Sequence, residues 1–126
     1  MNQQRVFGKL VGITGFLGVA LGAFGAHGLE GVLSDEMLKI YQTGVLYHLI
    51  HSAALLSLVC ANQKLWTSPW ISRICIAWLA GIMIFSGSLY VLATTGIKIL
   101  GAITPVGGIA FLLGWAMVTK IIKFVP

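Results

Sequence analysis

Four long apolar stretches, separated by short segments that hold most of the charged residues, make up this chain. The clearest stretch runs from Ile40 to Ala61, 22 residues without an acidic or basic side chain apart from two histidines. A helix of that length extends about 33 Å, close to the thickness of a bilayer's hydrocarbon core. We therefore expect a membrane span there, and further spans wherever the same pattern recurs.

The pattern predicts an all-α membrane protein, a bundle of four transmembrane helices arranged as two antiparallel hairpins. The expected spans cover residues 8–26, 38–61, 71–93 and 100–119, and residues 1–126 form a single integral membrane domain. Composition agrees with this class, because 58% of the residues are hydrophobic and only 9% are charged.

The second span carries polar side chains at helical spacing. His48 and His51 lie three residues apart, on one helical face with Tyr41, Gly44 and Ser52. Polar groups at bilayer depth are costly unless they face protein or a water-filled cavity, so this face is expected to point into the bundle.

The third span runs antiparallel to the second, which brings two serines of the third span to about the depth of His48. These serines are candidate hydrogen-bond partners for His48. The candidate intramembrane polar site therefore comprises His51, His48, Tyr47, Tyr41, Ser86 and Ser88.

Two interpretations of this site are open. Its imidazoles could fix the register of the helices through hydrogen bonds, or they could bind or relay a proton or ligand within the bilayer. A zinc or haem site would need further convergent ligands, and no acidic residue lies within the spans beside the histidines. We therefore expect neither a metal nor another cofactor.

Glycines recur every three or four residues in the first span, and small residues recur similarly in the third and fourth. Such stripes let helices approach closely in lipid, so we interpret them as packing surfaces. Alternatively, the glycine backbone lines a permeation path. The glycines expected in helix packing are Gly15, Gly18, Gly22, Gly25, Gly81 and Gly114. Their spacing leaves open whether the contacts lie within one chain or between chains.

A second candidate site lies at the outer face. Thr104 before Pro105 is typical of an N-cap followed by the first helical residue, although a start near Ile99 would make the proline a kink. Exposed amides there could hold an anion or a lipid headgroup together with residues after the first span. This candidate outer-face site comprises His27, Glu30, Thr104, Gly107 and Gly108. Alternatively, His27 only caps its loop by bonding glycine-rich backbone.

The basic residues predict the orientation of the bundle. With four spans, one side holds six Lys or Arg residues and the other holds only Lys39 and Lys98. The positive-inside rule then places both termini in the cytoplasm, in a multi-pass protein of the bacterial inner membrane.

The net charge is +5, but the basic residues are scattered along the chain rather than clustered, so nucleic acid is not an expected partner. Cys60 and Cys75 show no metal or redox spacing and are expected to be reduced.

Motifs in every span resemble one known family. They are Gly22-Ala-Phe-Gly-Ala-His27-Gly-Leu29, Tyr47-x-x-x-His51, Phe85-Ser-Gly-Ser-Leu-Tyr90, Gly101-Ala-Ile-Thr-Pro-Val-Gly-Gly108 and Gly114-Trp115. This set resembles the YgdD/YwdK-type family of small bacterial membrane proteins, which has a mitochondrial transmembrane relative in animals. The resemblance implies a four-span membrane protein of unknown function. In the family pattern a glutamine often stands where this chain has His48, whereas His27 and His51 match it.

No catalytic arrangement is evident in the sequence. It shows no Ser-His-acid order, no phosphate-binding loop and no pair of carboxylates within the membrane. We therefore expect a non-enzymatic structural or interaction protein, whose partners are the lipid bilayer and a second copy or another membrane protein. The alternative is a small transporter or channel in which His51 and His48 handle a proton or polar solute.

Overall fold

The computed structural model describes residues 2–125, and all the regular secondary structure in that range is helical. Its long helices are α1 (Gln3–His27), α2 (Asp35–Val59), a third span over Pro69–Thr95, and α5 (Leu100–Ile121). The third span consists of α3 (Pro69–Gly81), the π-helical turn η2 (Ile82–Ser86) and α4 (Gly87–Thr95). Short 3-10 helices, η1 (Leu65–Thr67) and η3 (Ile122–Phe124), follow α2 and α5.

All four long helices are apolar enough and long enough to cross a bilayer, which confirms the predicted fold class. Each expected span coincides with one of them, except that the second was expected to reach residue 61 and α2 ends at Val59. The π turn inside the third span was not predicted. It adds a residue to one turn and so changes the helical register of everything that follows.

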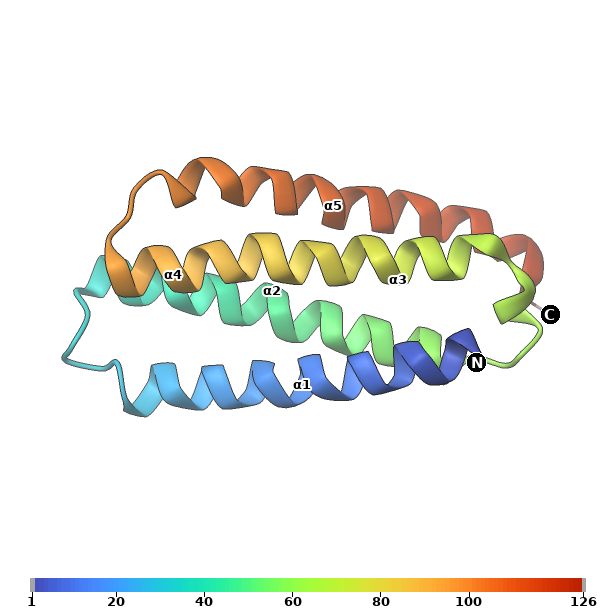
Figure 1. Cartoon of the computed structure of the whole chain (residues 1–126), viewed down its shortest axis with the longest axis horizontal. Helices are drawn as coiled ribbons and strands as arrows, with labels where there is room; N and C mark the ends of the chain where they lie inside the picture. The colour runs from blue at the N-terminus through green and yellow to red at the C-terminus, as the bar shows by residue number, and fades with distance from the viewer. Residues whose placement is uncertain (1, 126) are drawn as a thin grey trace.

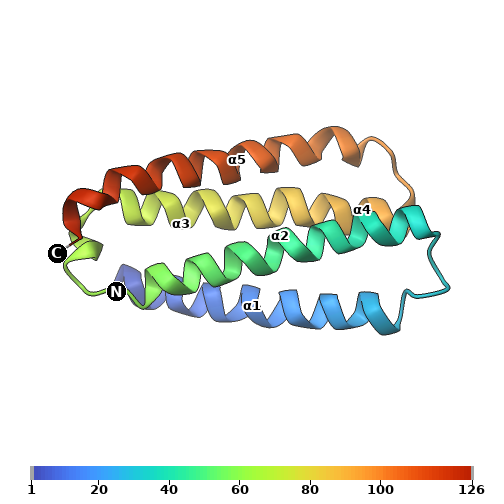
Figure 2. The ribbon, with the colours of Figure 1, turned by 180° about the vertical axis from the view of Figure 1, so that it is seen from behind.

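The helices form two antiparallel hairpins, α1 with α2 and the third span with α5 (Figure 1). The loops over residues 28–34 and 96–99 lie at one end, called here the loop end. The start of α1, the end of α5 and residues 60–68 lie at the other, called the termini end. Figure 2 shows the same order from behind, with α1 and α5 at opposite edges of the bundle. Helix α1 packs chiefly on α2, whereas α2 and α5 both pack on the third span.

Side-chain caps explain where two helices begin. The Ser34 hydroxyl accepts a hydrogen bond from the Met37 amide at 3.2 Å, and Asp35 and Glu36 follow in the first turn, where the helix dipole favours negative charge. Ser68 caps α3 in the same way, directly before a proline at the first helical position.

Helix α5 begins at Leu100, so the expected start at Thr104 and Pro105 is wrong and the alternative near Ile99 is confirmed. Pro105 lies inside the helix, where its missing amide costs only the bond to the Gly101 carbonyl in the first turn. The Thr104 hydroxyl donates to the Leu100 carbonyl at 3.1 Å instead of capping a helix.

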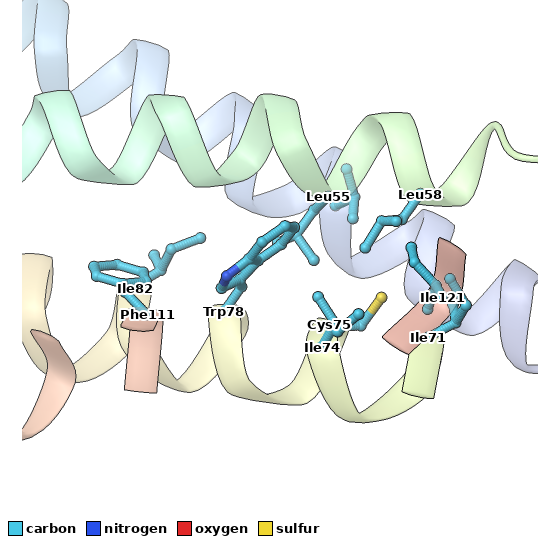
Figure 3. Close-up of a cluster of buried hydrophobic side chains, with 10 residues drawn as sticks. Leu55, Leu58, Ile71, Ile74, Cys75, Trp78, Ile82, Phe111 and Ile121 are labelled. Atoms are coloured by element: carbon cyan, nitrogen blue, oxygen red, sulfur yellow. The ribbon is translucent and has the colours of Figure 1, made fainter. Parts of the chain in front are cut away.

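The largest apolar cluster joins α2, α3 and α5 toward the termini end. In Figure 3, Trp78 extends from α3 toward Leu55 of α2, with Phe111 of α5 beside it. The buried members are Val11, Leu55, Leu58, Ile71, Ile74, Cys75, Trp78, Ile82, Phe111 and Ile121. Both cysteines are free thiols, Cys75 within this cluster and Cys60 on the surface.

Glycines allow the closest helix contacts inside the bundle. A methyl group built at any of six of them would collide with, or press tightly on, a neighbouring helix; they are Gly18, Gly25, Gly44, Gly81, Gly107 and Gly114. At Gly107 the obstacle is the backbone of Phe85, which no rotamer change can move. Gly22 is nearly as tight against Val45, whereas Gly15 has no neighbouring atom within 4 Å. Most of the expected packing glycines therefore serve contacts within this chain.

Gly107 and its neighbour offer a matched test of this packing. We expect Gly107→Ala to lower the free energy of unfolding by about 1–3 kcal/mol, because the new methyl group meets backbone. Gly108→Ala adds the same atoms where the nearest neighbour is 3.8 Å away, so it should be neutral or stabilising by up to about 1 kcal/mol. Thermal unfolding in lipid nanodiscs checks both, and equal effects of the two variants would contradict the packing at Gly107.

Candidate functional site

His48 and His51 are both buried, with 4% and 3% of their surface exposed, but they serve different contacts. His48 bonds to α1 and α4: its Nε2 lies 2.9 Å from the Thr14 carbonyl oxygen and its Nδ1 3.0 Å from the Tyr90 hydroxyl. The expectation that the buried face of α2 points into the bundle is correct, and this side chain joins three helices.

His51 bonds within α2 and to α5. Its Nδ1 lies 2.8 Å from the Tyr47 carbonyl oxygen, one helical turn earlier. The indole N–H of Trp115 donates to its Nε2 at 3.0 Å. The imidazole also stacks on the Phe111 ring, with centroids 3.7 Å apart and planes 12° apart, and meets Trp78 edge-on at 5.8 Å.

These partners assign one tautomer to His51. A carbonyl oxygen can only accept, so Nδ1 carries the hydrogen; an indole N–H can only donate, so Nε2 offers its lone pair. A proton on Nε2 would face the Trp115 N–H and break that bond. His51 is therefore neutral here, with both ring nitrogens engaged.

His48 has the opposite tautomer and a more adaptable partner. Its Nε2–H donates to the Thr14 carbonyl, and its Nδ1 accepts from the Tyr90 hydroxyl. A hydroxyl group can also accept, so His48 can hold a second proton with both hydrogen bonds kept once the Tyr90 hydroxyl rotates. The two histidines thus differ in what they can do, although each ties α2 to its neighbours.

Ser86 and Ser88 are not partners of His48, so that expectation is wrong. The Ser86 hydroxyl donates to the Gly44 carbonyl at 2.7 Å, and the Ser88 hydroxyl pairs with that of Thr104 at 2.7 Å. The physical reason is depth and reach: Ser86 lies beside Gly44, one helical turn before His48, and Ser88 bonds to Thr104 of α5, whereas the longer Tyr90 side chain reaches the imidazole.

Tyr41 and Tyr47 have different surroundings. The Tyr41 ring is buried beside Gly25, and its hydroxyl donates to the Leu21 carbonyl of α1 at 2.7 Å. The Tyr47 ring lies against Phe85 and Phe111, with centroids 4.6 and 6.1 Å away, and is partly exposed. Sequence reasoning did not anticipate the roles of Thr14, Tyr90, Phe111 and Trp115. Helical spacing within α2 cannot reveal them, because they lie on other helices.

The candidate outer-face residues lie on opposite edges of the bundle. His27 ends α1 and Glu30 lies in the next loop, both exposed, whereas Thr104, Gly107 and Gly108 belong to α5. Since α1 and α5 lie at opposite edges in both views, these residues do not form one site (Figures 1 and 2). Gly107 is buried against Phe85 and presents no free amide, because it lies beyond the first turn of α5.

The tautomers can be observed directly. We expect ¹⁵N NMR of histidine-labelled protein in lipid to show a hydrogen on Nδ1 of His51 and on Nε2 of His48 near neutral pH. Trp115→Phe should keep the hydrogen on Nδ1, because the Tyr47 carbonyl still accepts from it, but should shift the Nε2 resonance and cost about 0.6 kcal/mol of stability, the average for such bonds in membranes. His48 should keep its signals in that variant, and a protonated His51 in the wild type would contradict the assignment.

Comparison with known proteins places these residues in a family. Residues 21–108 match the family model described as "Protein of unknown function (DUF423)". The chain is 49% identical over 117 residues to the UPF0382 membrane protein YwdK of Bacillus subtilis, covering 91% of this chain and 94% of the relative. It is 42% identical over 105 residues to the UPF0382 inner membrane protein YgdD of Escherichia coli, covering 83% and 79%.

No solved structure matches the chain. The family resemblance noted in the sequence is confirmed, and so is a multi-pass membrane protein, because the relatives are named as membrane proteins and four apolar helices are present. This chain belongs to the DUF423 family, the UPF0382 membrane proteins, whose function is unknown.

Proposed function

We propose that this protein is a non-enzymatic interaction protein of the membrane, whose α1–α2 hairpin binds the same hairpin of a second copy. The observation that carries the proposal is an open seam between α1 and α2. Methyl groups built at Gly12 and Gly15 meet no atom within 4 Å, whereas one at Gly18, on the adjacent face, would collide with Leu49. Small residues left open on a lipid-facing helix are suited to close contact with another helix.

The seam is long enough for a transmembrane helix. One groove of about 410 Å³ runs beside Gly8, Gly12 and Gly15, and a second of about 240 Å³ runs beside Gly22 and Ala26. The two grooves share Leu49 of α2 and together extend from residue 8 to residue 26, about 27 Å along α1.

Ser52 is a polar residue beside the seam. It lines the larger groove and is only 5% exposed, and its hydroxyl has no hydrogen-bond partner among the described residues. An unpaired hydroxyl in an apolar environment costs free energy. Because the oxygen itself is enclosed, a helix docked beside Gly12 and Gly15 can pair with it only when the Ser52 side chain rotates toward the groove.

A second copy fits because α1 carries, at nearly the same depth, both open glycines and a large exposed side chain that can cover them. Phe16 is 74% exposed and lies one turn from Gly12 and next to Gly15. In a two-fold dimer with its axis along the membrane normal, the α1 helices are parallel and equal residues lie at equal depth. Phe16 of one copy can then cover the glycines of the other, and the reverse contact follows by symmetry.

The histidines favour this function over transport. His51 would have to break its bond to Trp115 before accepting a proton at Nε2, and His48 is enclosed by α1 and α4. Their hydrogen bonds tie helices together, as the register-fixing interpretation requires.

For orientation, we propose that the termini end faces the cytoplasm. The structure gathers six basic residues there, at the start of α1, in residues 60–73 and at the end of α5, and leaves Lys39 and Lys98 toward the loop end. Both dimer partners would then share one orientation in the bilayer.

Energy transfer between labelled copies in liposomes tests the dimer. The exposed Cys60 can take donor and acceptor dyes while Cys75 is buried. We expect transfer above the random level, and Gly15→Leu should raise the dissociation constant at least about tenfold, since the added side chain fills the seam without disturbing the monomer.

Gly87→Leu is the matched control, because Gly87 also has no neighbour within 4 Å but lies in the third span. It should leave the dissociation constant unchanged. Wild-type transfer no greater than random, or equal weakening by both substitutions, would contradict the proposal. A His51-dependent proton flux in the same liposomes would favour the transporter alternative instead.

A further inference from the structure

A third groove lies away from the α1–α2 seam, between α2 and α5. Its volume is about 460 Å³, within the range of small-molecule sites. Its lining includes four aromatic rings, namely Tyr47, His51, Phe111 and Trp115. Pro105 and Gly108 contribute a stretch of α5 without long side chains. Ile109 and Leu112 complete the lining, so the groove is aromatic on one side and largely aliphatic along α5.

The hydroxyl of Tyr47 is the unexplained group in this groove. Tyr47 is 39% exposed, and within residues 2–125 its hydroxyl forms no hydrogen bond, unlike those of Tyr41 and Tyr90. It lies midway along α2 (Asp35–Val59), about 18 Å from either end of the helix. A phenol at the centre of a bilayer has no water to bond, so its donor needs an acceptor from a bound molecule.

That depth limits what the acceptor can be. The ester carbonyls of ordinary phospholipids lie at the boundary of a hydrocarbon core about 30 Å thick, roughly 15 Å from its centre. Their acyl chains reach the groove but carry no acceptor. The acceptor must therefore belong to a molecule whose polar atoms themselves enter the hydrocarbon core.

The rings of the groove favour a flat molecule. His51 and Phe111 are buried and stacked face to face on each other, so the Tyr47 ring, which is 39% exposed, gives the groove an accessible aromatic face. Trp115 adds a partly exposed indole whose N–H is already taken by His51. Planar rings stack favourably on such faces, and the Tyr47 hydroxyl is the donor left for them.

We propose that the α2–α5 groove binds a lipid-soluble molecule with a planar, carbonyl-bearing ring, of the quinone class, which enters sideways from the bilayer. The Tyr47 hydroxyl donates to a ring carbonyl, and the ring stacks on the exposed rings of Tyr47 and Trp115. The hydrogen-bonded, neutral His51 lies behind them and is a positioning residue, because its bonds hold Trp115 and the turn at Tyr47 in place.

Quenching of tryptophan fluorescence by decylubiquinone, a short-chain quinone, tests this site in phospholipid nanodiscs. We expect a saturable component from the indole of Trp115 above the linear quenching by quinone free in the lipid. Tyr47→Phe keeps the ring and removes only the hydroxyl, so it should weaken the saturable component about tenfold. Gly108→Leu should abolish it by filling the groove, where an added methyl group meets no atom closer than 3.8 Å.

Gly15→Leu is the control that separates this inference from the proposed dimer. It alters the α1–α2 seam and should leave quinone binding unchanged, whereas Gly108→Leu should leave dimerisation unchanged. Purely linear quenching of the wild type, or an unchanged saturable component in Tyr47→Phe, would overturn the inference. So would displacement of the quinone by dodecylbenzene at equal concentration, because that competitor has the ring and chain without the carbonyl.

Discussion

Hydrogen-bond pairing in a medium without water is the constraint on which this bundle depends. Every polar side chain placed within the spans has to find its partner inside the protein or expose an unpaired group to hydrocarbon. Helix α2 shows this most clearly, because its two histidines bond to all three other spans. His48 reaches the backbone of α1 and the Tyr90 hydroxyl of α4, and the Trp115 indole of α5 reaches back to His51. Each bond is modest, but together they join α2 to every other span and allow one relative rotation of the helices.

Close approach through glycine makes these bonds possible. His48 reaches the Thr14 carbonyl because α1 lies tightly against α2 at Gly18, where a methyl group would lie within 3.2 Å of the imidazole. Tyr41 bonds to the Leu21 carbonyl beside Gly25 for the same reason. In α5, Gly114 admits the Trp78 ring next to the His51–Trp115 pair. Glycine packing and polar pairing are therefore one arrangement, since the first sets the distances that the second requires.

The spans and the buried face of α2 were predictable because each depends on residues close together in the chain. Hydrophobic length decides the spans, and helical spacing decides that His48 and His51 share a face with Tyr41. The partners were not predictable, because they depend on how neighbouring helices are rotated. Ser86 and Ser88 bond to Gly44 and Thr104 instead of His48, and no spacing within one helix indicates that Tyr90 takes their place.

The glycine pattern shows the same limit. Gly15 and Gly18 belong to one stripe and look equivalent in the sequence, yet Gly18 packs on α2 and Gly15 faces open space. Helix α1 has a single main neighbour, so only one flank of its stripe is used within the chain. Which flank is used follows from tertiary contacts, and these decide whether a glycine serves folding or remains available to a partner.

Among the residues that the structure describes, the polar side chains without a hydrogen-bond partner differ in where they lie. The Trp78 N–H is unpaired but closed within the core against Gly114, so packing of the large ring offsets its cost and no partner can reach it. Ser52 lines the α1–α2 seam and Tyr47 the α2–α5 groove. The Ser52 oxygen is as enclosed as the Trp78 nitrogen, whereas Tyr47 is 39% exposed, so of these groups the Tyr47 hydroxyl is the one that a molecule from the bilayer can reach. Under the two proposals, the α1–α2 seam would hold a second copy of the chain and the α2–α5 groove a lipid-soluble ring, on different sides of α2.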